Sequence, residues 1–253
     1  MINLIKGLLF LFVVINVTSC VPAYYMANSA MEPFVFTKPL YHDTATVSSY
    51  IGGKFNTSLD SAYNNSGETN SFGQIYWFRT HIQKYYNFSY GAFGYLGNYK
   101  VTAVNELAGN KSYFGGGVSG EFCVNIPIDV IDIRVIGLKG TMYYEDGNYR
   151  RFKMLARDQK LAITSTDLYG YNLSETFGMD IKLNKISSVG WYISNGMSGQ
   201  LISGERFFTS SAVLNYQTQK FTLYLQSSST WLRGLSTLFG IGSEVSVGLN
   251  YRL

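Results

Sequence analysis

The stretch that most constrains the fold runs from Ile241 to Leu253, where apolar and polar residues alternate with a period of two. One set of alternate positions is mostly aliphatic and ends on Tyr251 and Leu253. The other set is small or polar and includes Glu244 and Arg252. Successive side chains of a strand point to opposite faces of a sheet, so this alternation predicts a β-strand with one apolar and one polar face.

The same alternation recurs along the chain and predicts ten strands in all. They cover about residues 44–56, 72–83, 86–96, 112–125, 130–144, 172–183, 187–195, 206–216, 220–231 and 241–253. The third and seventh patterns are the weakest, so eight strands are the alternative. In the fifth pattern the alternation loses its phase near Gly137, which indicates a β-bulge.

The links between these strands alternate between short and long. Short links surround Lys84, Pro127, Lys185 and Thr218, whereas the other links cover 57–71, 97–111, 145–171, 196–205 and 232–240. Transmembrane barrels have short turns on the periplasmic side and longer loops outside the cell. The alternation therefore favours a membrane barrel, and an even number of strands places both ends of the chain on the periplasmic side.

Composition also favours a membrane barrel. Aromatic residues make up 16% of the chain, with 21 tyrosines, while charged residues make up only 14%. Aromatic side chains form girdles where a barrel meets the membrane interfaces, and soluble domains carry more surface charge. We therefore predict an all-β fold, a transmembrane antiparallel up-and-down β-barrel over residues 44–253. The alternative is a soluble β-barrel or sandwich whose apolar faces point inward.

The lumen of this barrel is predicted to be closed and polar. Barrels of about eight strands are filled by side chains, and open channels need about sixteen strands. Because buried charges are costly unless paired, we expect the inward charges to form an ion-pair network. The predicted members are Lys54, Arg79, Glu121, Asp132, Arg134, Asp180, Lys182, Glu244 and Arg252.

The first residues predict a lipoprotein signal peptide over 1–19. Lys6 precedes an apolar run that is too short to span a bilayer, and Val17-Thr18-Ser19-Cys20 resembles a bacterial lipobox. Cys20 is then the site of lipid attachment. The alternative is an ordinary secretory signal that is cut near Ser19 or Ala23.

Residues 20–43 are predicted to form an acylated periplasmic arm. Pro22, Pro33 and Pro39 fall in this segment, and proline cannot donate a hydrogen bond to a sheet. Acylation of Cys20 would leave Cys123 without a partner, so no disulfide is expected.

The sequence shows no constellation typical of catalysis or metal binding. His42 and His81 are the only histidines, and neither they nor the thiol of Cys123 has catalytic or metal-ligand spacing. The run Gly115-Gly116-Gly117 lies inside a predicted strand, which indicates bending or close packing and not a phosphate loop. Basic residues form no stripe interleaved with stacking aromatics. We expect no enzyme activity, no metal, no nucleic-acid partner and no cofactor besides the covalent lipid.

One long loop carries a cluster of cations, which are Arg150, Arg151, Lys153, Arg157 and Lys160. Arginine can pair bidentately with anionic oxygens, so this cluster suggests contact with the phosphates of lipopolysaccharide. The alternative is a solvated loop without a ligand.

A second loop, residues 231–239, is unusually apolar. Its candidate contact residues are Trp231, Leu232, Leu235, Leu238 and Phe239. Such a loop is not expected to face water, so it either dips into the outer interface or packs on a partner.

The lipobox, the proline-containing arm and the small barrel together resemble the outer-membrane barrel lipoproteins of the Bacteroidota. The resemblance implies a Gram-negative outer membrane and an accessory role in a large complex for protein insertion, secretion or import. Surface-exported lipoproteins of that group carry an acidic or Lys-Asp/Glu signal after the cysteine. Val21-Pro22-Ala23 follows Cys20 here, so the resemblance implies a lipid anchor in the periplasmic leaflet. Expected partners are outer-membrane lipids, lipopolysaccharide and other outer-membrane proteins. The alternatives are a free-standing surface-binding barrel or adhesin and, more remotely, a barrel enzyme.

Overall fold

The structure, a computed structural model, describes residues 24–25, 34–39, 46–58, 68–102, 107–161, 163–164, 166–203, 206–233 and 238–253. For 24–25, 163–164, 232–233 and 238–242 the description covers the backbone only. Cys20, His42 and Leu235 lie outside the described residues.

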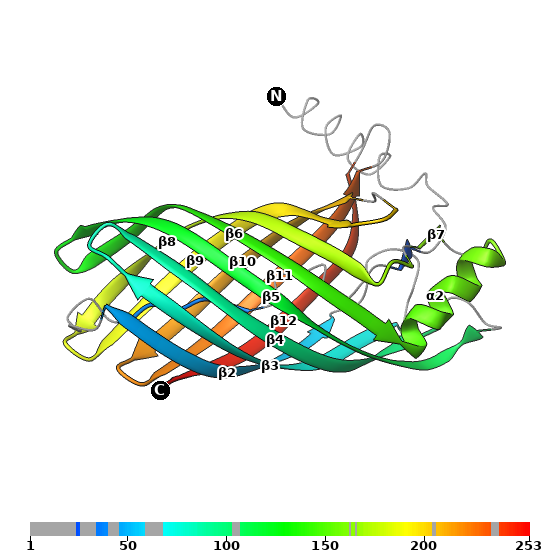
Figure 1. The fold of residues 1–253 in the computed structure, drawn as a ribbon, viewed down its shortest axis with the longest axis horizontal. Coiled ribbons are helices and arrows are strands. Elements are labelled where there is room, and N and C mark those ends of the chain that lie inside the picture. The colour runs from blue at the N-terminus through cyan, green and yellow to red at the C-terminus, as the bar shows by residue number, and fades with distance from the viewer. Residues whose placement is uncertain are drawn as a thin grey trace, which may run out of the picture.

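Within the described part of the chain, ten antiparallel strands close into one barrel in which each strand pairs with its neighbours in sequence (Figure 1). β12 returns to pair with β2 and closes the sheet. The prediction of ten strands is therefore confirmed, including the third and the seventh. The strands are β2 (Val47–Ser58), β3 (Thr69–Ile82), β4 (Tyr86–Val101), β5 (Gly109–Ile128), β6 (Ile131–Gly147), β8 (Tyr169–Asn184), β9 (Ser187–Gln200), β10 (Arg206–Thr218), β11 (Phe221–Arg233) and β12 (Leu238–Arg252).

The bulge predicted near Gly137 is present in β6. The register between β6 and β8 shifts between Arg134 and Gly137. The two residues between them, Val135 and Ile136, are consecutive and both exposed. An extra residue in one strand of a pair resets the alternation, which explains why the sequence pattern lost its phase at this point.

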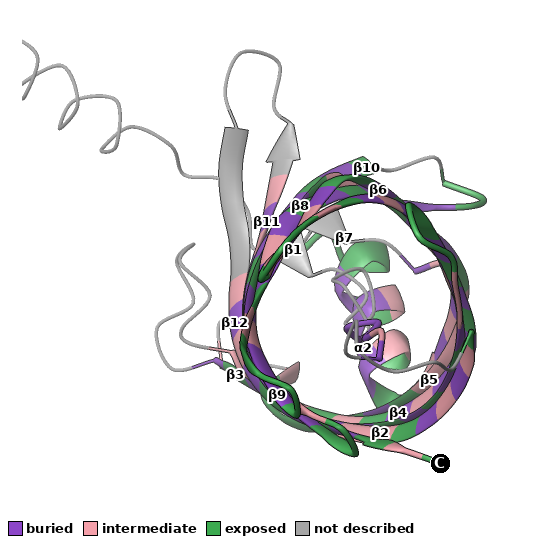
Figure 2. Cartoon of the chain, turned by 90° about the vertical axis from the view of Figure 1, so that its left-hand side faces the viewer, coloured by how far each residue is buried: buried purple, intermediate pink, exposed green. Residues whose placement is uncertain are grey.

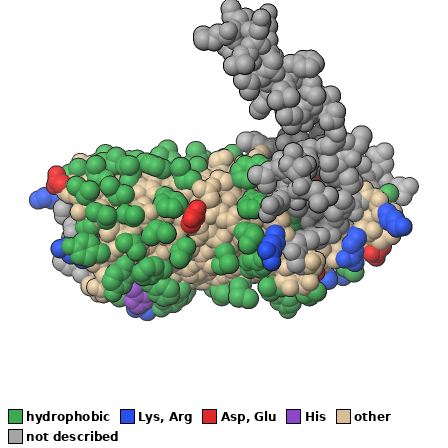
Figure 3. All heavy atoms as spheres, turned by 90° about the horizontal axis from the view of Figure 1, so that it is seen from above, with side chains coloured by type: hydrophobic (Ala, Val, Ile, Leu, Met, Phe, Trp, Pro, Cys, Tyr) green, Lys and Arg blue, Asp and Glu red, His purple; other side chains and the backbone are tan. Residues whose placement is uncertain are grey.

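The apolar faces of the strands point outward and the polar faces point into the lumen. Ile75 and Leu96 are 74% and 72% exposed on the outer wall, whereas their strand neighbours Gln74 and Tyr95 are buried. Hydrophobic side chains cover much of the wall that is not hidden by grey atoms in Figure 3. A soluble barrel needs the opposite orientation, so the wall is built to face lipid.

The two ends of the barrel differ. The short connections at 83–85, 129–130, 185–186 and 219–220 lie at one end, called here the turn end, together with the end of β12. The long connections lie at the opposite end, called here the loop end. In Figure 1 the turn end is on the left and the loop end is on the right.

The loop end also carries secondary structure of its own. The link between β6 and β8 contains α2 (Asn148–Asp158) and the short strand β7 (Ile163–Thr164), which pairs in parallel with β1 (Tyr24–Tyr25). Tyr149 on α2 stacks on Tyr99 of β4, with ring centroids 4.7 Å apart. Among the described residues no helix is long and apolar enough to cross a membrane.

Glycines on the inner wall make room for aromatic rings. Gly97 lies directly opposite Tyr113 on the next strand, and a Cβ at Gly97 would be 2.5 Å from the Tyr113 ring. In the same way a Cβ at Gly115 would be 2.3 Å from the hydroxyl oxygen of Tyr95, its cross-strand partner. Each ring therefore lies along the wall and covers its glycine, which agrees with the close packing predicted for Gly115-Gly116-Gly117.

Candidate functional site in the barrel lumen

The lumen is occupied by a piece of the chain itself. Residues 34–39, called here the lumen segment, belong to no strand, and Phe34, Val35, Phe36 and Thr37 are all buried. The ring of Phe34 stacks on Tyr76 of β3 at 4.7 Å, and Phe36 meets Phe78 edge-on at 5.4 Å. In Figure 2, which looks along the barrel from the turn end, the trace of this region and α2 fall within the ring of strands.

Backbone carbonyl groups fix the lumen segment to four different strands. Lys139 of β6 donates to the carbonyl oxygen of Phe34, and Asn250 of β12 donates to that of Val35 at 3.4 Å. Thr80 of β3 donates to the carbonyl oxygen of Thr37 at 3.0 Å, and Gln217 of β10 donates to that of Lys38. A buried carbonyl without a partner is costly, so these donors explain how a non-strand segment can lie inside the barrel.

The side chain of Lys38 adds an ion pair near the turn end. Its Nζ contacts Asp132 Oδ2 of β6 at 2.5 Å and lies 3.9 Å from Asp180 Oδ2 of β8. Asp180 also accepts from the hydroxyl of Tyr192. The sequence predicted Asp132 and Asp180 as inward charges. Lys38, their cation, falls within residues 20–43, which were predicted to form a periplasmic arm. The structure instead puts residues 34–39 of that arm inside the lumen.

A second buried pair joins two of the residues predicted for the lumen. Arg134 Nη1 donates to Glu121 Oε1 at 3.0 Å, and the hydroxyl of Thr176 donates to the same oxygen at 3.2 Å. The guanidinium carbon of Arg134 also lies 4.4 Å from the centre of the Tyr192 ring, which is a cation–π contact. This cluster joins the four neighbouring strands β5, β6, β8 and β9 on one side of the lumen.

The remaining predicted lumen residues are more scattered. Lys54 and Glu244 are buried, and Glu244 accepts a hydrogen bond from the amide of Asn70 at 3.1 Å. Lys182 and Arg252 are partly exposed near the ends of β8 and β12, and Lys182 Nζ donates to the Asp129 carbonyl oxygen at 3.0 Å. These two residues therefore lie at the rim of the turn end.

The prediction for Arg79 is wrong. Its side chain is exposed on the outer wall of β3 near the turn end, next to His81, whereas Tyr76 and Phe78 point inward. The inner face of β3 is aromatic because it packs on the lumen segment, so polarity alone assigned the wrong face. The register of β2 and β3 shows that Phe78, and not Arg79, faces the lumen, because Tyr50, which points inward, pairs directly with Phe78.

The cluster of cations predicted to contact lipopolysaccharide lies on and after α2, not in an irregular loop. Lys153 is buried, and its Nζ lies 3.5 Å from Glu145 Oε1, so it is not available to an external anion. Arg150 donates to the Thr166 carbonyl oxygen at 2.9 Å, and Arg157 donates to the Thr166 hydroxyl at 2.6 Å. Arg151, Arg157 and Lys160 remain exposed at the loop end.

Of the apolar 231–239 stretch, the structure describes only the side chain of Trp231. It is partly buried on the outer face of β11, directly opposite Phe208 of β10, near the loop end. Leu232, Leu238 and Phe239 belong to β11 and β12, but their side chains lie outside the described set, as does all of Leu235. Aromatic residues at this height are typical of an interfacial girdle.

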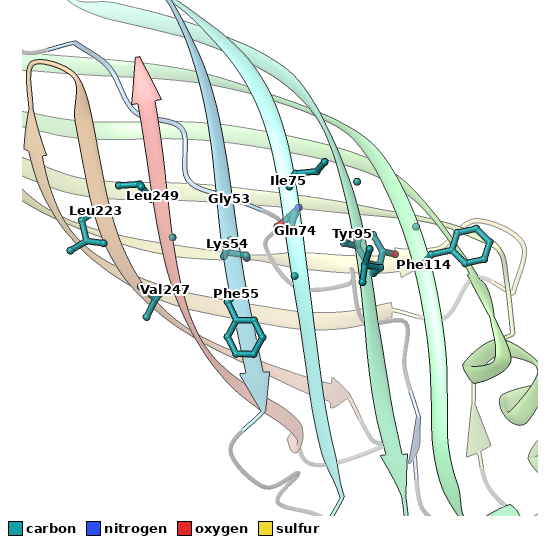
Figure 4. A pocket seen from close by; sticks show the side chains of 15 residues that line it. Gly53, Lys54, Phe55, Gln74, Ile75, Tyr95, Phe114, Leu223, Val247 and Leu249 are labelled. Carbon is teal, nitrogen blue, oxygen red and sulfur yellow. The ribbon is translucent and has the colours of Figure 1, made fainter. Parts of the chain in front are cut away.

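An apolar groove with a volume of about 810 Å³ lies on the outer wall over β2 to β5 and β11 to β12 (Figure 4). Gly53, Gly73 and Gly94 contribute to its lining, and the side chains of Phe55, Ile75, Leu223 and Leu249 surround it. The groove faces outward, so it belongs to the lipid-facing surface and not to the lumen.

Among the described residues, the titratable groups outside these clusters form no recognisable catalytic arrangement. The ring of His81 is stacked against Tyr90 on the outer wall, 5.8 Å away. Cys123 is a free, buried thiol. Within the part of the chain that the structure describes, no group of three or more His, Cys, Asp or Glu residues could hold a metal ion.

Sequence reasoning missed the lumen segment, Lys139 and the Lys153–Glu145 pair. The apolar run Phe34-Val35-Phe36 close to Lys38 was the available signal, but the flanking Pro33 and Pro39 favoured an irregular arm. The inward position of Lys139 could have been read from the phase of β6 once the bulge at Gly137 was counted.

A closed barrel with a lipid-facing apolar wall and a filled lumen defines a transmembrane β-barrel of the outer-membrane type. No protein-family model matches the chain, and no curated protein matches it. Among solved structures, the β domain of the Bordetella autotransporter BrkA is similar at 11% identity, over 82% of this chain and 99% of that one, with a TM-score of 0.44. An outer membrane channel from Pseudomonas putida F1 matches at 9% identity, over 86% of this chain and 100% of that one, with a TM-score of 0.45.

Proposed function

We propose that the protein is a non-catalytic, non-conducting outer-membrane barrel that serves as an accessory or scaffold subunit of a larger outer-membrane complex. The observation that carries this proposal is the lumen segment. A path for solutes would need an open lumen, but Phe34 and Phe36 fill its middle and the pair of Lys38 and Asp132 lies near the turn end. A barrel whose interior is filled presents only its outer wall and its two ends to other molecules.

The proposal includes a lipid on Cys20, a Gram-negative host and the Bacteroidota-type lipoprotein class, all of which rest on the sequence pattern. Protein insertion, secretion and import machineries are the complexes in which such a subunit would serve. The described titratable residues support a non-catalytic role, because their buried charges are engaged with each other or with the lumen segment.

Planar-bilayer recording tests the closed lumen directly. The purified protein should give no stable conductance steps, with a reconstituted porin as the positive control. The matched variant replaces Phe34 and Phe36 with serine, which removes the two rings packed on Tyr76 and Phe78. Reproducible porin-sized steps from the unaltered protein would contradict the proposal.

Affinity purification in a mild detergent tests the accessory role. A tagged chain should co-purify with other outer-membrane proteins in a fixed ratio and elute at a mass well above its own 28.3 kDa. A protein that elutes alone, with only detergent and lipid, would favour a free-standing barrel.

One observation favours the second candidate, a surface-binding barrel. The loop end is built around α2, with Arg151, Arg157 and Lys160 exposed on it or just after it. These cations could contact lipopolysaccharide phosphates. Replacing the three with glutamate should then reduce co-purifying lipopolysaccharide, while the same change at Lys185 of the turn end should have no effect.

A further inference from the structure

A row of polar side chains crosses the lipid-facing wall of five consecutive strands. Cross-strand pairing places Glu175 of β8 opposite Asn195 of β9, and Asn195 opposite Ser210 of β10. Ser210 in turn faces Ser229 of β11, and Ser229 faces Ser243 of β12. Residues that pair directly share a face of the sheet, so these five form one continuous outward row, called here the polar row.

The Glu175 end of the polar row lies inside the apolar belt and not at its edge. Glu175 and Asn195 are exposed. On the same face of β8, Leu173 and Phe177 flank Glu175, and on β10 Phe208 flanks Ser210; all three are exposed. Figure 3 shows an acidic side chain surrounded by hydrophobic ones in the middle of a wall.

The wall of β4 to β6 has no counterpart to this row. In the middle of β4, β5 and β6 the outward-facing residues are apolar or glycine, for example Ala92, Gly94, Val118, Gly140 and Met142. The wall of β8 to β12 is thus chemically different from the wall of β4 to β6, although both would face the same lipid.

A carboxylate in the apolar part of a bilayer is costly, and such residues usually pair with another polar group. No described residue forms an ion pair or hydrogen bond with Glu175. We propose that the polar row is the docking face for a membrane-embedded segment of another protein, which presents a lysine or arginine to Glu175 and hydrogen-bonding side chains to Asn195 and the serines. This proposal rests on the accessory role proposed above and identifies the surface that carries it.

Charge complementarity distinguishes this partner from a second copy of the chain. On the described part of this wall the outward cation is Arg206, at the loop end, whereas Lys182 and Arg252 follow the inward phase of their strands and lie at the rim of the turn end. A copy docked on this wall would therefore bring serines and another carboxylate to the depth of Glu175, and no cation. Acyl chains offer no hydrogen bond at all, so lipid leaves the carboxylate unpaired.

Site-specific photocrosslinking tests the proposal in the full-length protein in its own membrane. A benzoylphenylalanine at Asn195 should give a discrete protein adduct, and the same probe at Leu96, on the wall of β4, should not. Glu175→Gln keeps the shape but removes the charge, so it should lower the Asn195 adduct at least about tenfold, as expected for a lost interfacial charge pair. Heat-modifiable migration on gels checks that each variant still forms a barrel.

The possible results separate this inference from the accessory role. A partner peptide that carries lysine or arginine, and that is lost with Glu175→Gln, supports the inference. If a complex still co-purifies but Glu175→Gln leaves it unchanged, the accessory role stands and the polar row is not its interface. An adduct of lipid only, or of a second copy, overturns the inference. If no protein co-purifies and neither probe forms a protein adduct, both proposals fail.

Discussion

At the scale of single residues, the barrel depends on buried charges that have only a few partners each. Glu121 is almost fully buried and receives hydrogen bonds from Arg134 and Thr176 on one oxygen. Removing one member of a buried pair leaves the other uncompensated, which is more costly than removing both.

The first prediction concerns this pair. Arg134→Met should lower the free energy of unfolding by about 3–5 kcal/mol, because Glu121 loses its cation in a desolvated site. Urea titration of the protein in lipid vesicles measures this free energy of unfolding. The double variant with Glu121→Gln should recover a large part of the loss, and Arg151→Met on the exposed face of α2 should change stability by less than about 0.5 kcal/mol. Equal losses in all three variants would show that the pair is not the cause.

The residue scale is also where sequence reasoning failed most often. Glu121, Arg134, Asp132 and Asp180 were placed inward correctly by the period of two. Arg79 was not, because near the turn end the outer face of β3 carries Arg79 and His81 while Tyr76 and Phe78 face the lumen. Lys153 was taken for a surface cation, since no strand period reveals that a helix turns one of its basic residues toward the buried Glu145.

At the scale of the element, each strand pair is shaped by glycines that face aromatic rings across the ladder. Tyr76 covers Gly52, Tyr192 covers Gly178 and Tyr224 covers Gly248 in the same cross-strand manner. At all three glycines a Cβ would lie within 2.5 Å of the ring. Glycine weakens an ordinary strand, but here the missing side chain leaves the space that an aromatic ring of the lumen occupies.

The second prediction compares two glycines. Gly97→Ala should destabilise the barrel by about 1–3 kcal/mol, because its Cβ would overlap the Tyr113 ring and Phe72 Cβ, each 2.5 Å away. Gly73→Ala is the matched control, because no atom lies within 4 Å of its Cβ position on the outer wall. The measurement compares the urea midpoints of unfolding of the two variants in the same vesicles. A larger loss at Gly73 would contradict the packing argument.

Elements were predictable to different degrees for a physical reason. A strand that faces lipid on one side and a polar lumen on the other must alternate, so all ten barrel strands left a readable pattern. The lumen segment is surrounded by the barrel on every side, and α2 spans only Asn148–Asp158 in a long link. Neither has the two-sided environment that imposes a period of two.

At the scale of the whole molecule, the path of the N-terminal part is the most consequential feature. β1 pairs with β7, which follows α2 at the loop end. The lumen segment then runs from Phe34, beside the mid-barrel Tyr76, to Lys38, beside Asp132 near the turn end. β2 begins at Val47, at the turn end. Taken in order, the described residues therefore pass from the loop end through the lumen to the turn end.

This path bears on the position of a lipid anchor. Tyr24 lies four positions after Cys20, and an extended chain covers at most about 14 Å over that length. The apolar band of an outer-membrane barrel is about 25 Å tall. With Tyr24 at the loop end, an acyl chain on Cys20 is expected to enter the outer leaflet, whereas the residues after the cysteine implied the periplasmic one.

The last prediction tests this path by labelling single cysteines in a Cys123→Ser background with a maleimide that does not cross the outer membrane. Tyr24→Cys should react in intact cells as readily as Arg151→Cys, which is exposed at the loop end. Thr46→Cys should react only after the membrane is permeabilised, as should Lys185→Cys in the turn that joins β8 and β9. Labelling of denatured protein gives the total for each variant. If Tyr24→Cys behaves like Lys185→Cys, the chain enters the lumen from the periplasmic side, and the anchor belongs to the inner leaflet after all.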